Sequence, residues 1–303
     1  LENKFELVES LKKLKNSKLD KLLLEQHYVN LFDVYKKKLN LNKFRKLFDA
    51  NRVWILKFIY GHAGKNIIVL DSFSSFIKFI YQVIKNNKKK WLKVNYQEYL
   101  KYGRWKKSNF LFEWVLQEYL TQPALLKNRK FHIRGYYLFY NNANKKEGYI
   151  FHNSRIALAN KEYKNKNYLD KNIHDTHLPI NPTKNVLNLN PHIYNLMSNK
   201  QVNKFEKDLQ YLFNSITKIN KVKCYSTDLS CYNVYGFDIM LTNDFKIKLI
   251  ECNLYPGLPP YQADLDKINH PYHIFDGIIE CIVDKKFKGK TLPNKENKFI
   301  KVF

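Results

Sequence analysis

Long apolar stretches are absent from this 303-residue chain. No run of apolar residues approaches the roughly 18 that a membrane-spanning helix needs. The first residues also show no hydrophobic segment of the kind that directs secretion. We therefore expect no membrane association and a cytoplasmic location, in the host cytoplasm if the chain comes from a virus or an intracellular parasite.

Cysteine is scarce, with Cys224, Cys231, Cys252 and Cys281 as the four examples and no CxxC pair among them. In a chain of this length an even number of cysteines is weak evidence for disulfide bonds. A reducing compartment fits this usage best, in agreement with a cytoplasmic location.

Acidic residues and arginine are also few. The 27 Asp and Glu residues stand against 53 Lys and Arg residues, which gives a net charge of +26. Such a field attracts acidic partners from a distance. Only six of the basic residues are arginine and 47 are lysine, a bias typical of an AT-rich genome. Because arginine is the usual residue for bidentate contacts to phosphates and bases, the composition favours an acidic protein over nucleic acid as the partner.

The content of hydrophobic and aromatic residues indicates a globular protein. Hydrophobic residues make up 45% of the chain and aromatic residues 16%, which excludes intrinsic disorder. A chain of this length can bury a large core in two or three lobes. The expected helices, by periodicity, are residues 5–50, 72–86, 203–218 and 271–283. The expected strands are residues 53–59, 67–70, 112–120, 129–139, 236–241 and 245–253. Polar segments are expected to be a linker at 86–90, an irregular substrate-facing loop at 159–202 and a poorly ordered basic tail at 285–301.

A hairpin near residue 60 has the features of a phosphate-binding loop. Its first strand carries Lys57, and its loop contains Gly61 and Gly64. Loop amides of this kind can fold over a phosphate, and a lysine in the strand would reach the same anion. The alternative is an ordinary hairpin with an edge lysine, which is favoured on this segment alone because no GxGxxG or Walker pattern is present.

Basic residues gather on one face of the strand at 129–139. Lys130, His132 and Arg134 alternate with the apolar residues Phe131 and Ile133, so the three point to the same side. Groups of this charge repel one another unless an anion lies among them. The alternative is a solvated face.

Three oxygen-bearing side chains occupy the strands at 236–253. Glu251 lies 13 residues after Asp238, and Asn253 lies 15 residues after it. Such a set can hold Mg²⁺, which prefers oxygen ligands and shares them with phosphates. Strand alternation places Glu251 and Asn253 on the face of Ile247 and Leu249. A carboxylate on such an apolar face is costly unless it has a binding partner. The alternative is an acid at a sheet edge or a turn.

In their order along the chain, these motifs resemble the tubulin tyrosine ligase-like family of ATP-grasp ligases over roughly residues 52–284. The matching segments are Trp54-Ile55-Leu56-Lys57, Gly64-Lys65-Asn66-Ile67, Gln117-Glu118-Tyr119-Leu120 with Pro123, Leu125 and Leu126, Arg129 to Arg134, Arg155, and Asp238, Glu251 and Asn253 with Pro256. Three positions depart from the family pattern: Phe58 stands where the family has proline, Asn66 where it has glycine, and His132 where it has aspartate.

The resemblance implies an α+β ATP-grasp fold, in which two α/β lobes with mainly antiparallel sheets clasp ATP. The expected parts are a short helical N-terminal region at 1–50, a central lobe at 51–122, and a C-terminal lobe at 123–303 that ends in the basic tail.

The resemblance also implies roles for individual residues. The catalytic residues would be Arg134, Arg155 and Lys57. The ATP-binding residues would be Lys57, Gly61, Gly64, Lys65, Gln117, Glu118, Tyr119, Leu120, Lys130 and His132. Mg²⁺ would be bound by Asp238, Glu251 and Asn253. His174 and His177 could form a metal pair, but two histidines in a polar loop are more often solvated.

Two functions follow from the sequence. The first is an ADP-forming ligase, expected to be monomeric, that joins a free amino acid (Glu, Gly or Tyr) to an acidic protein acceptor such as the tubulin tail through an acylphosphate. Such chemistry needs positioning and charge neutralisation rather than a Ser or Cys nucleophile, and no convincing nucleophile is present. The second is a catalytically decayed ATP-grasp scaffold that binds nucleic acid or microtubules.

Overall fold

The computed structural model describes residues 5–49, 52–61, 66–142, 145–151, 154–176, 186–188, 193–219, 231–253 and 299–301. The chain forms two compact units. Unit 1 comprises Leu1–Leu23, Pro123–Tyr163 and Pro179–Phe303, and unit 2 comprises Leu24–Gln122 and Lys164–Leu178. The chain passes from one unit to the other after residues 23, 122, 163 and 178. The expected N-terminal region does not form a separate part, because its residues are shared between the two units.

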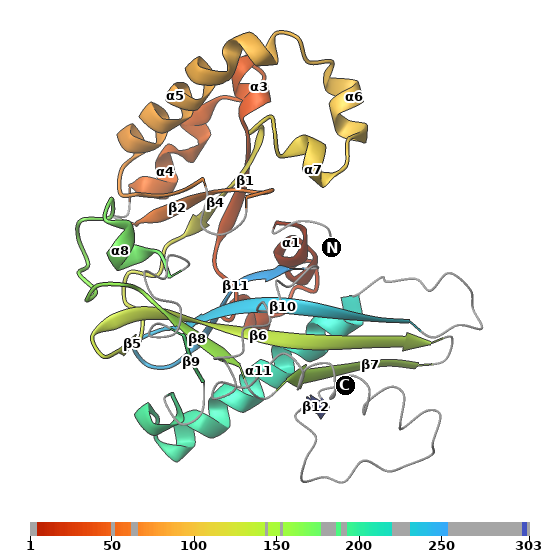
Figure 1. Cartoon of the computed structure of the whole chain (residues 1–303), viewed down its shortest axis with the longest axis vertical. Helices are drawn as coiled ribbons and strands as arrows, with labels where there is room; N and C mark the ends of the chain where they lie inside the picture. Colours follow the sequence, from red (N-terminus) through yellow and green to blue (C-terminus); the bar gives the residue numbers. More distant parts are fainter. Residues whose placement is uncertain are drawn as a thin grey trace, which may run out of the picture. The chain divides into compact units, whose positions relative to one another are not determined.

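Unit 2 contains a four-stranded sheet in the order β1–β4–β2–β3 (Figure 1). Its strands are β1 (Gln26–Asn30), β4 (Glu113–Glu118), β2 (Trp54–Phe58) and β3 (Ile67–Leu70), all paired antiparallel. The expectation of continuous helix over residues 5–50 was wrong at β1. There the aromatic and β-branched centre Tyr28-Val29 suits a strand, and pairing with β4 buries Val29 completely.

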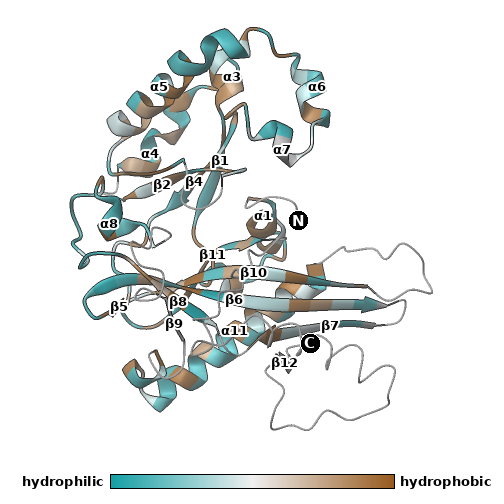
Figure 2. Cartoon of the chain, in the orientation of Figure 1, coloured by the Kyte–Doolittle hydropathy of each residue, from teal (hydrophilic) through white to brown (hydrophobic). Residues whose placement is uncertain are grey.

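One face of this sheet is covered by the amphipathic helix α5 (Phe73–Trp91). Ser72 caps its first turn by accepting a hydrogen bond from the amide of Ser75, and Phe76, Ile80 and Trp91 are buried. Figure 2 shows hydrophilic and hydrophobic residues alternating along it. The linker expected at 86–90 is part of this helix, since neither Gly nor Pro interrupts the segment. The other helices of unit 2 are α3 (Leu31–Tyr35), η1 (Leu41–Phe44), α4 (Arg45–Phe48), α6 (Tyr96–Lys101), α7 (Arg104–Lys107) and α8 (Lys171–His174).

Unit 1 contains a larger sheet in which β11–β10–β6–β7–β12 follow one another. These strands are β11 (Ile247–Asn253), β10 (Cys231–Leu241), β6 (Arg129–Asn142), β7 (Lys145–Phe151) and β12 (Phe299–Lys301). β8 (Arg155–Leu158) and the short β5 (Leu125–Leu126) also pair with β6, and β9 (Val186–Asn188) pairs with β8. The expected basic tail therefore ends in a strand that pairs with β7. The helix expected at 271–283 lies outside the described residues.

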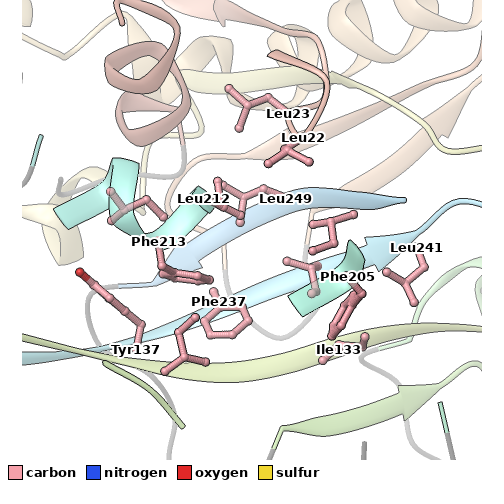
Figure 3. Packing of buried hydrophobic residues seen from close by; sticks show 14 of the residues in the cluster. Leu22, Leu23, Ile133, Tyr137, Phe205, Leu212, Phe213, Phe237, Leu241 and Leu249 are labelled. Carbon is pink, nitrogen blue, oxygen red and sulfur yellow. The ribbon is translucent and has the colours of Figure 1, made fainter. Parts of the chain in front are cut away.

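The core of unit 1 lies between one face of this sheet and the helices α1 (Glu6–Lys12), α2 (Ser17–Asp20) and α11 (Asn199–Ile219). Figure 3 shows Phe213 of α11 beside Tyr137 and Phe237 of the sheet, and Phe205 of α11 beside Ile133. The Phe213 and Phe237 ring centroids are 4.4 Å apart. The short helix η2 (Tyr194–Leu196) precedes α11. The opposite face of β6 and β10 is not part of this core, and the polar residues of these strands lie on it.

A β-bulge in β11 decides which face Glu251 occupies. Ile239 pairs with Leu249, but Asp238 pairs with Glu251, so Ile250 is an additional residue in its strand. The bulge reverses the alternation, and Glu251 shares a face with Asp238 rather than with Leu249. Our expectation that Glu251 and Asn253 lie on the face of Ile247 and Leu249 was therefore wrong.

Two further observations concern membrane-spanning helices and disulfide bonds. None of the helices in the described part of the chain is long and apolar enough to cross a bilayer. Cys231 is disulfide-bonded, which the cysteine spacing gave no reason to expect, whereas Cys252 is a free thiol.

Candidate active site

Four charged residues form a continuous row across four adjacent strands of unit 1. Arg155 of β8 pairs with Arg134 of β6, which pairs with Asp238 of β10, which pairs with Glu251 of β11. Directly paired residues of antiparallel strands project to the same side of a sheet. All four side chains therefore lie on the face opposite the hydrophobic core. All four were predicted as site residues, and the sheet brings them together.

The centre of the row is a bidentate ion pair. Arg134 donates to both oxygens of Asp238, through Nε to Oδ1 and through Nη2 to Oδ2, the latter over 2.8 Å. The Asp238 side chain is almost fully buried. Burial alone would raise the pKa of Asp238, but the charges of Arg134 and His132 outweigh it and lower that pKa. Burial alone would lower the pKa of Arg134, and Asp238 raises it instead. Asp238 is thus held as a carboxylate.

Arg155, at one end of the row, has no carboxylate partner among the described residues. Its pKa is lowered by burial and by the charge of Arg134 opposite it. A half-buried guanidinium beside a second one is unfavourable unless an anion neutralises it. Tyr136 adjoins both arginines, since each lowers the pKa of its phenol against the larger effect of burial. The arrangement is suited to an anion such as a phosphoryl group.

The other end of the row carries side chains with oxygen atoms. Glu251 is buried beside Asp238, and Asn253 Nδ2 donates to Glu251 Oε1 over 2.9 Å. No group of three His, Cys, Asp or Glu residues that could hold a metal occurs within the described ranges. The set of two carboxylates and one amide nevertheless fits Mg²⁺, which takes its remaining ligands from phosphates and water. Arg134 already contacts both oxygens of Asp238, so a cation there would compete with Arg134.

His132 and Lys130 lie on the same face of β6, as predicted. Both are buried, and His132 Nε2 is 3.6 Å from Asp238 Oδ1. The histidine that departs from the family pattern therefore faces the carboxylate at the centre of the row.

In unit 2, two predicted residues meet on one face of the sheet. Lys57 Nζ of β2 donates to Gln117 Oε1 of β4 over 2.9 Å, and both side chains are buried. Gln26 of β1 lies directly opposite Gln117 and is also buried. Sequence reasoning missed Gln26, because it precedes the strand's only aromatic and β-branched residues.

In the segment predicted to receive adenine, two backbone amides already form hydrogen bonds within the protein. The amide of Glu118 donates to the Glu25 carbonyl over 2.8 Å, and the amide of Tyr119 donates to the Val53 carbonyl over 2.9 Å. The Glu118 carboxylate is 3.2 Å from Arg52 Nη2. Among these predicted residues, the amide of Leu120 is therefore the better candidate to receive a nucleobase.

His174 is not solvated, contrary to our expectation for the polar loop. The Tyr119 hydroxyl lies 2.7 Å from His174 Nδ1, and both residues are buried. The ring of Tyr168 is tilted against that of His174 at 5.3 Å between centroids. These contacts attach the segment 164–178 to the end of β4. Its partner in the suggested metal pair, His177, lies outside the described residues.

The predicted glycine loop is described only at its ends. The amide of Gly61 donates to the Phe58 carbonyl over 3.0 Å, while Gly64 and Lys65 lie outside the described residues. Asn66 has a φ of 58°, a left-handed conformation that glycine adopts freely and asparagine tolerates better than most residues. Asparagine at the family's glycine position is therefore compatible with this backbone.

Comparisons with known proteins give a consistent result. A family model described as the tubulin-tyrosine ligase family matches residues 2–290. A probable tubulin–tyrosine ligase of Schizosaccharomyces pombe is 23% identical over 190 residues, which cover 61% of this chain but only 45% of that relative. Among solved structures, the C-terminal domain of K. lactis Pby1, an ATP-grasp enzyme interacting with the mRNA decapping enzyme Dcp2, has a TM-score of 0.61 at 18% identity. That match covers 98% of this chain and 76% of the Pby1 chain.

Proposed function

Because the chain belongs to the tubulin-tyrosine ligase family and has the α+β ATP-grasp fold that we expected, we propose that it is an ATP-dependent ligase that forms an amide bond between an amino acid and a protein acceptor. The observation that carries the proposal is the row from Arg155 to Glu251. It combines an anion site at one end with oxygen ligands at the other, which is what phosphoryl transfer requires.

The proposed reaction has two steps. A carboxylate oxygen attacks the γ-phosphorus of ATP, the bond to the bridging oxygen breaks, and ADP leaves with that electron pair. An amine nitrogen then attacks the carbonyl carbon of the acylphosphate, phosphate leaves, and the nitrogen loses a proton.

Within this reaction the residues of unit 1 neutralise charge. Arg155 and Arg134 bind the transferred phosphoryl oxygens, and their fixed positions favour the transition state over the ground state. Asp238, Glu251 and Asn253 would hold Mg²⁺, which when bound supplies positive charge to the phosphates. Lys130 and His132 border this group on β6.

The residues of unit 2 would bind the nucleotide. Lys57, oriented by Gln117, would contact phosphate oxygens, and Gly61, Gly64 and Lys65 are proposed to bind the same phosphates. Adenine would bind at the segment Gln117-Glu118-Tyr119-Leu120, with the amide of Leu120 as the hydrogen-bond donor. The acceptor we propose is an acidic protein segment such as a tubulin tail, since the net charge is +26. The added amino acid would be Glu, Gly or Tyr, and the enzyme would act as a monomer in the cytoplasm.

The test uses purified protein with ATP, Mg²⁺, a pool of labelled amino acids, and tubulin or a Glu-rich peptide. Wild type should label the acceptor, and Arg155→Gln should reduce labelling by a factor of about 100 or more. Arg155→Gln should keep the fold, because it removes a charge that has no carboxylate partner in the described structure.

The control is Arg45→Gln, which removes an exposed arginine of α4 that stacks over Phe73 and should leave labelling unchanged. Equal labelling by wild type and Arg155→Gln would remove Arg155 from the mechanism. Failure of wild type to label any acceptor, with ATP binding intact, would reject the ligase.

A further inference from the structure

A groove in unit 2 lies outside both groups of residues described above. It has a volume of about 750 Å³ and is bordered by the C-terminal end of α5, the segment after it, α6 and Phe110. Three lysines, Lys89, Lys90 and Lys93, line it together with apolar side chains and a single acid, Glu98. The groove is therefore basic and partly apolar.

The charge of this region exceeds the general bias of the chain. Residues 85–110 contain nine Lys and Arg residues and one acid. Basic residues are thus about twice as frequent there as in the whole chain, and acids are about half as frequent. Lys89 and Lys93 are exposed and have no carboxylate partner in the described ranges. Their charges are available to a ligand.

The groove also presents apolar surface to solvent. Leu92, in its wall, is 62% exposed, and Leu100 on the adjoining α6 is 47% exposed. Exposed apolar side chains bordered by charge are typical of a site that binds another polypeptide.

The two aromatic residues of the groove contact each other and nearby lysines. Tyr102 and Phe110 stack on each other at 29° with 6.1 Å between centroids. Lys106 Nζ lies 3.6 Å from the Tyr102 centroid, and Lys90 Nζ lies 5.1 Å from that of Phe110. Lys90 also donates to the Asn109 carbonyl over 2.5 Å, which fixes this wall. Because each ring already has a stacked aromatic neighbour and a lysine over it, less ring surface remains for stacking nucleobases.

We propose that this groove binds an acidic polypeptide segment that carries an apolar side chain. The carboxylates of the segment contact Lys89 and Lys93, and its apolar side chain packs against Leu92 and the edges of Tyr102 and Phe110. Charge complementarity selects the class of partner, and lysine without arginine suits flexible carboxylates better than bidentate phosphate contacts. The inference does not depend on ligase activity, since the groove contains none of the residues assigned to that reaction.

The experiment measures fluorescence anisotropy of a labelled, short Glu-rich peptide with one Phe, titrated with the full chain. Lys89→Glu/Lys93→Glu should weaken binding at least about tenfold, as expected when two close attractions become repulsions. The control is Lys200→Glu/Lys207→Glu on α11, which makes the same change of net charge at two exposed lysines and should weaken binding less than about twofold.

Two further measurements separate the alternatives. The same peptide with Ser in place of Phe should bind more weakly to wild type, and Leu92→Ser should abolish that difference. A single-stranded RNA of similar length should compete poorly. Equal loss in both lysine pairs would show a diffuse charge effect, and tight RNA binding lost only in Lys89→Glu/Lys93→Glu would show a nucleic-acid site; either result overturns the proposal.

Discussion

Asp238 is the residue on which the candidate site is centred, because its two oxygens accept from Arg134 while Glu251 lies opposite. Two buried carboxylates side by side are stable only if a cation neutralises them. In this structure Arg134 supplies that charge. A divalent cation could supply it instead, so the two are expected to substitute for each other.

Arg134→Gln should therefore destabilise the protein by about 3–5 kcal/mol, because it leaves a buried charge uncompensated. Millimolar Mg²⁺ should restore part of this loss by binding the folded state. Wild type without nucleotide should respond little to Mg²⁺, since Arg134 already occupies Asp238. The measurement is the thermal unfolding midpoint of both proteins with and without Mg²⁺.

The matched control is the double variant Arg134→Gln/Asp238→Asn, in which both charges of the pair are removed. It should be less destabilised than the single variant and insensitive to Mg²⁺. If Mg²⁺ raises the midpoint of wild type and Arg134→Gln equally, then Arg134 and the cation do not compete.

Residue types and strand patterns were sufficient to place several residues of this row on strands. Arg134, Asp238 and Glu251 were expected on strands, and the structure places all three on strands and in one row. Their roles in the reaction stay predictions. The prediction of the face on which Glu251 lies was wrong, because the bulge formed by Ile250 cannot be recognised from the residue types in the strand. The buried contact of His174 with Tyr119 was not predicted, because the two residues are 55 positions apart in the sequence.

At the scale of elements, β6 and β10 pair over nine positions, and one of these pairs is an unusually close contact. Gly135 pairs with Phe237, and a Cβ added at Gly135 would overlap the Phe237 ring. The ring is fully buried and packs on Phe213. Glycine at this position allows an aromatic ring to lie against the backbone of the strand that carries Arg134.

Gly135→Ala should thus destabilise unit 1 by about 1–3 kcal/mol or more through overpacking. In Gly135→Ala/Phe237→Leu the two costs should not add, because the smaller side chain gives the methyl group room. Gly103→Ala is the control: no atom lies within 4 Å of its added Cβ, and its effect should stay within about 0.5 kcal/mol. Urea unfolding measures all of these. A neutral Gly135→Ala would show that the ring moves freely.

Element boundaries followed from local sequence where local signals were strong. β3 has the bounds that we expected, and Ser72 marks the start of α5 through its capping bond. The end of α5 was misplaced because Asn weakens a helix without ending it, and Lys is a good helix former. β1 was missed because a five-residue edge strand depends on β4, which lies far along the sequence.

The whole molecule carries many more positive than negative charges, with 53 Lys and Arg against 27 Asp and Glu. Such an excess destabilises a compact state through self-repulsion. We expect the unfolding midpoint to rise by a few degrees when KCl is raised from about 0.01 M to about 0.15 M, which shortens the Debye length from about 30 to about 8 Å.

A variant with less positive charge provides the comparison. Lys200→Glu/Lys207→Glu should show a smaller rise over the same range of KCl. A midpoint that is constant or falls in wild type would indicate that attractive pairs, such as Arg52 with Glu25, outweigh the general repulsion.

The division of the chain between its units has a consequence for synthesis on the ribosome. Helices α1 and α2 belong to unit 1, but the sheet and the helix α11, with which they share the core, are made only after residue 122. At about 5–20 residues per second, roughly 100 residues of unit 2 are made in about 5–20 s. During that interval the apolar side chains Leu7, Val8 and Leu11 have none of the later partners with which they share the core. Unit 2 in turn receives its last segment, 164–178, after β6, β7 and β8 have been made. Neither unit can be completed before the other has largely emerged, so this protein must keep exposed apolar surface from aggregating until more than half of its chain has been translated.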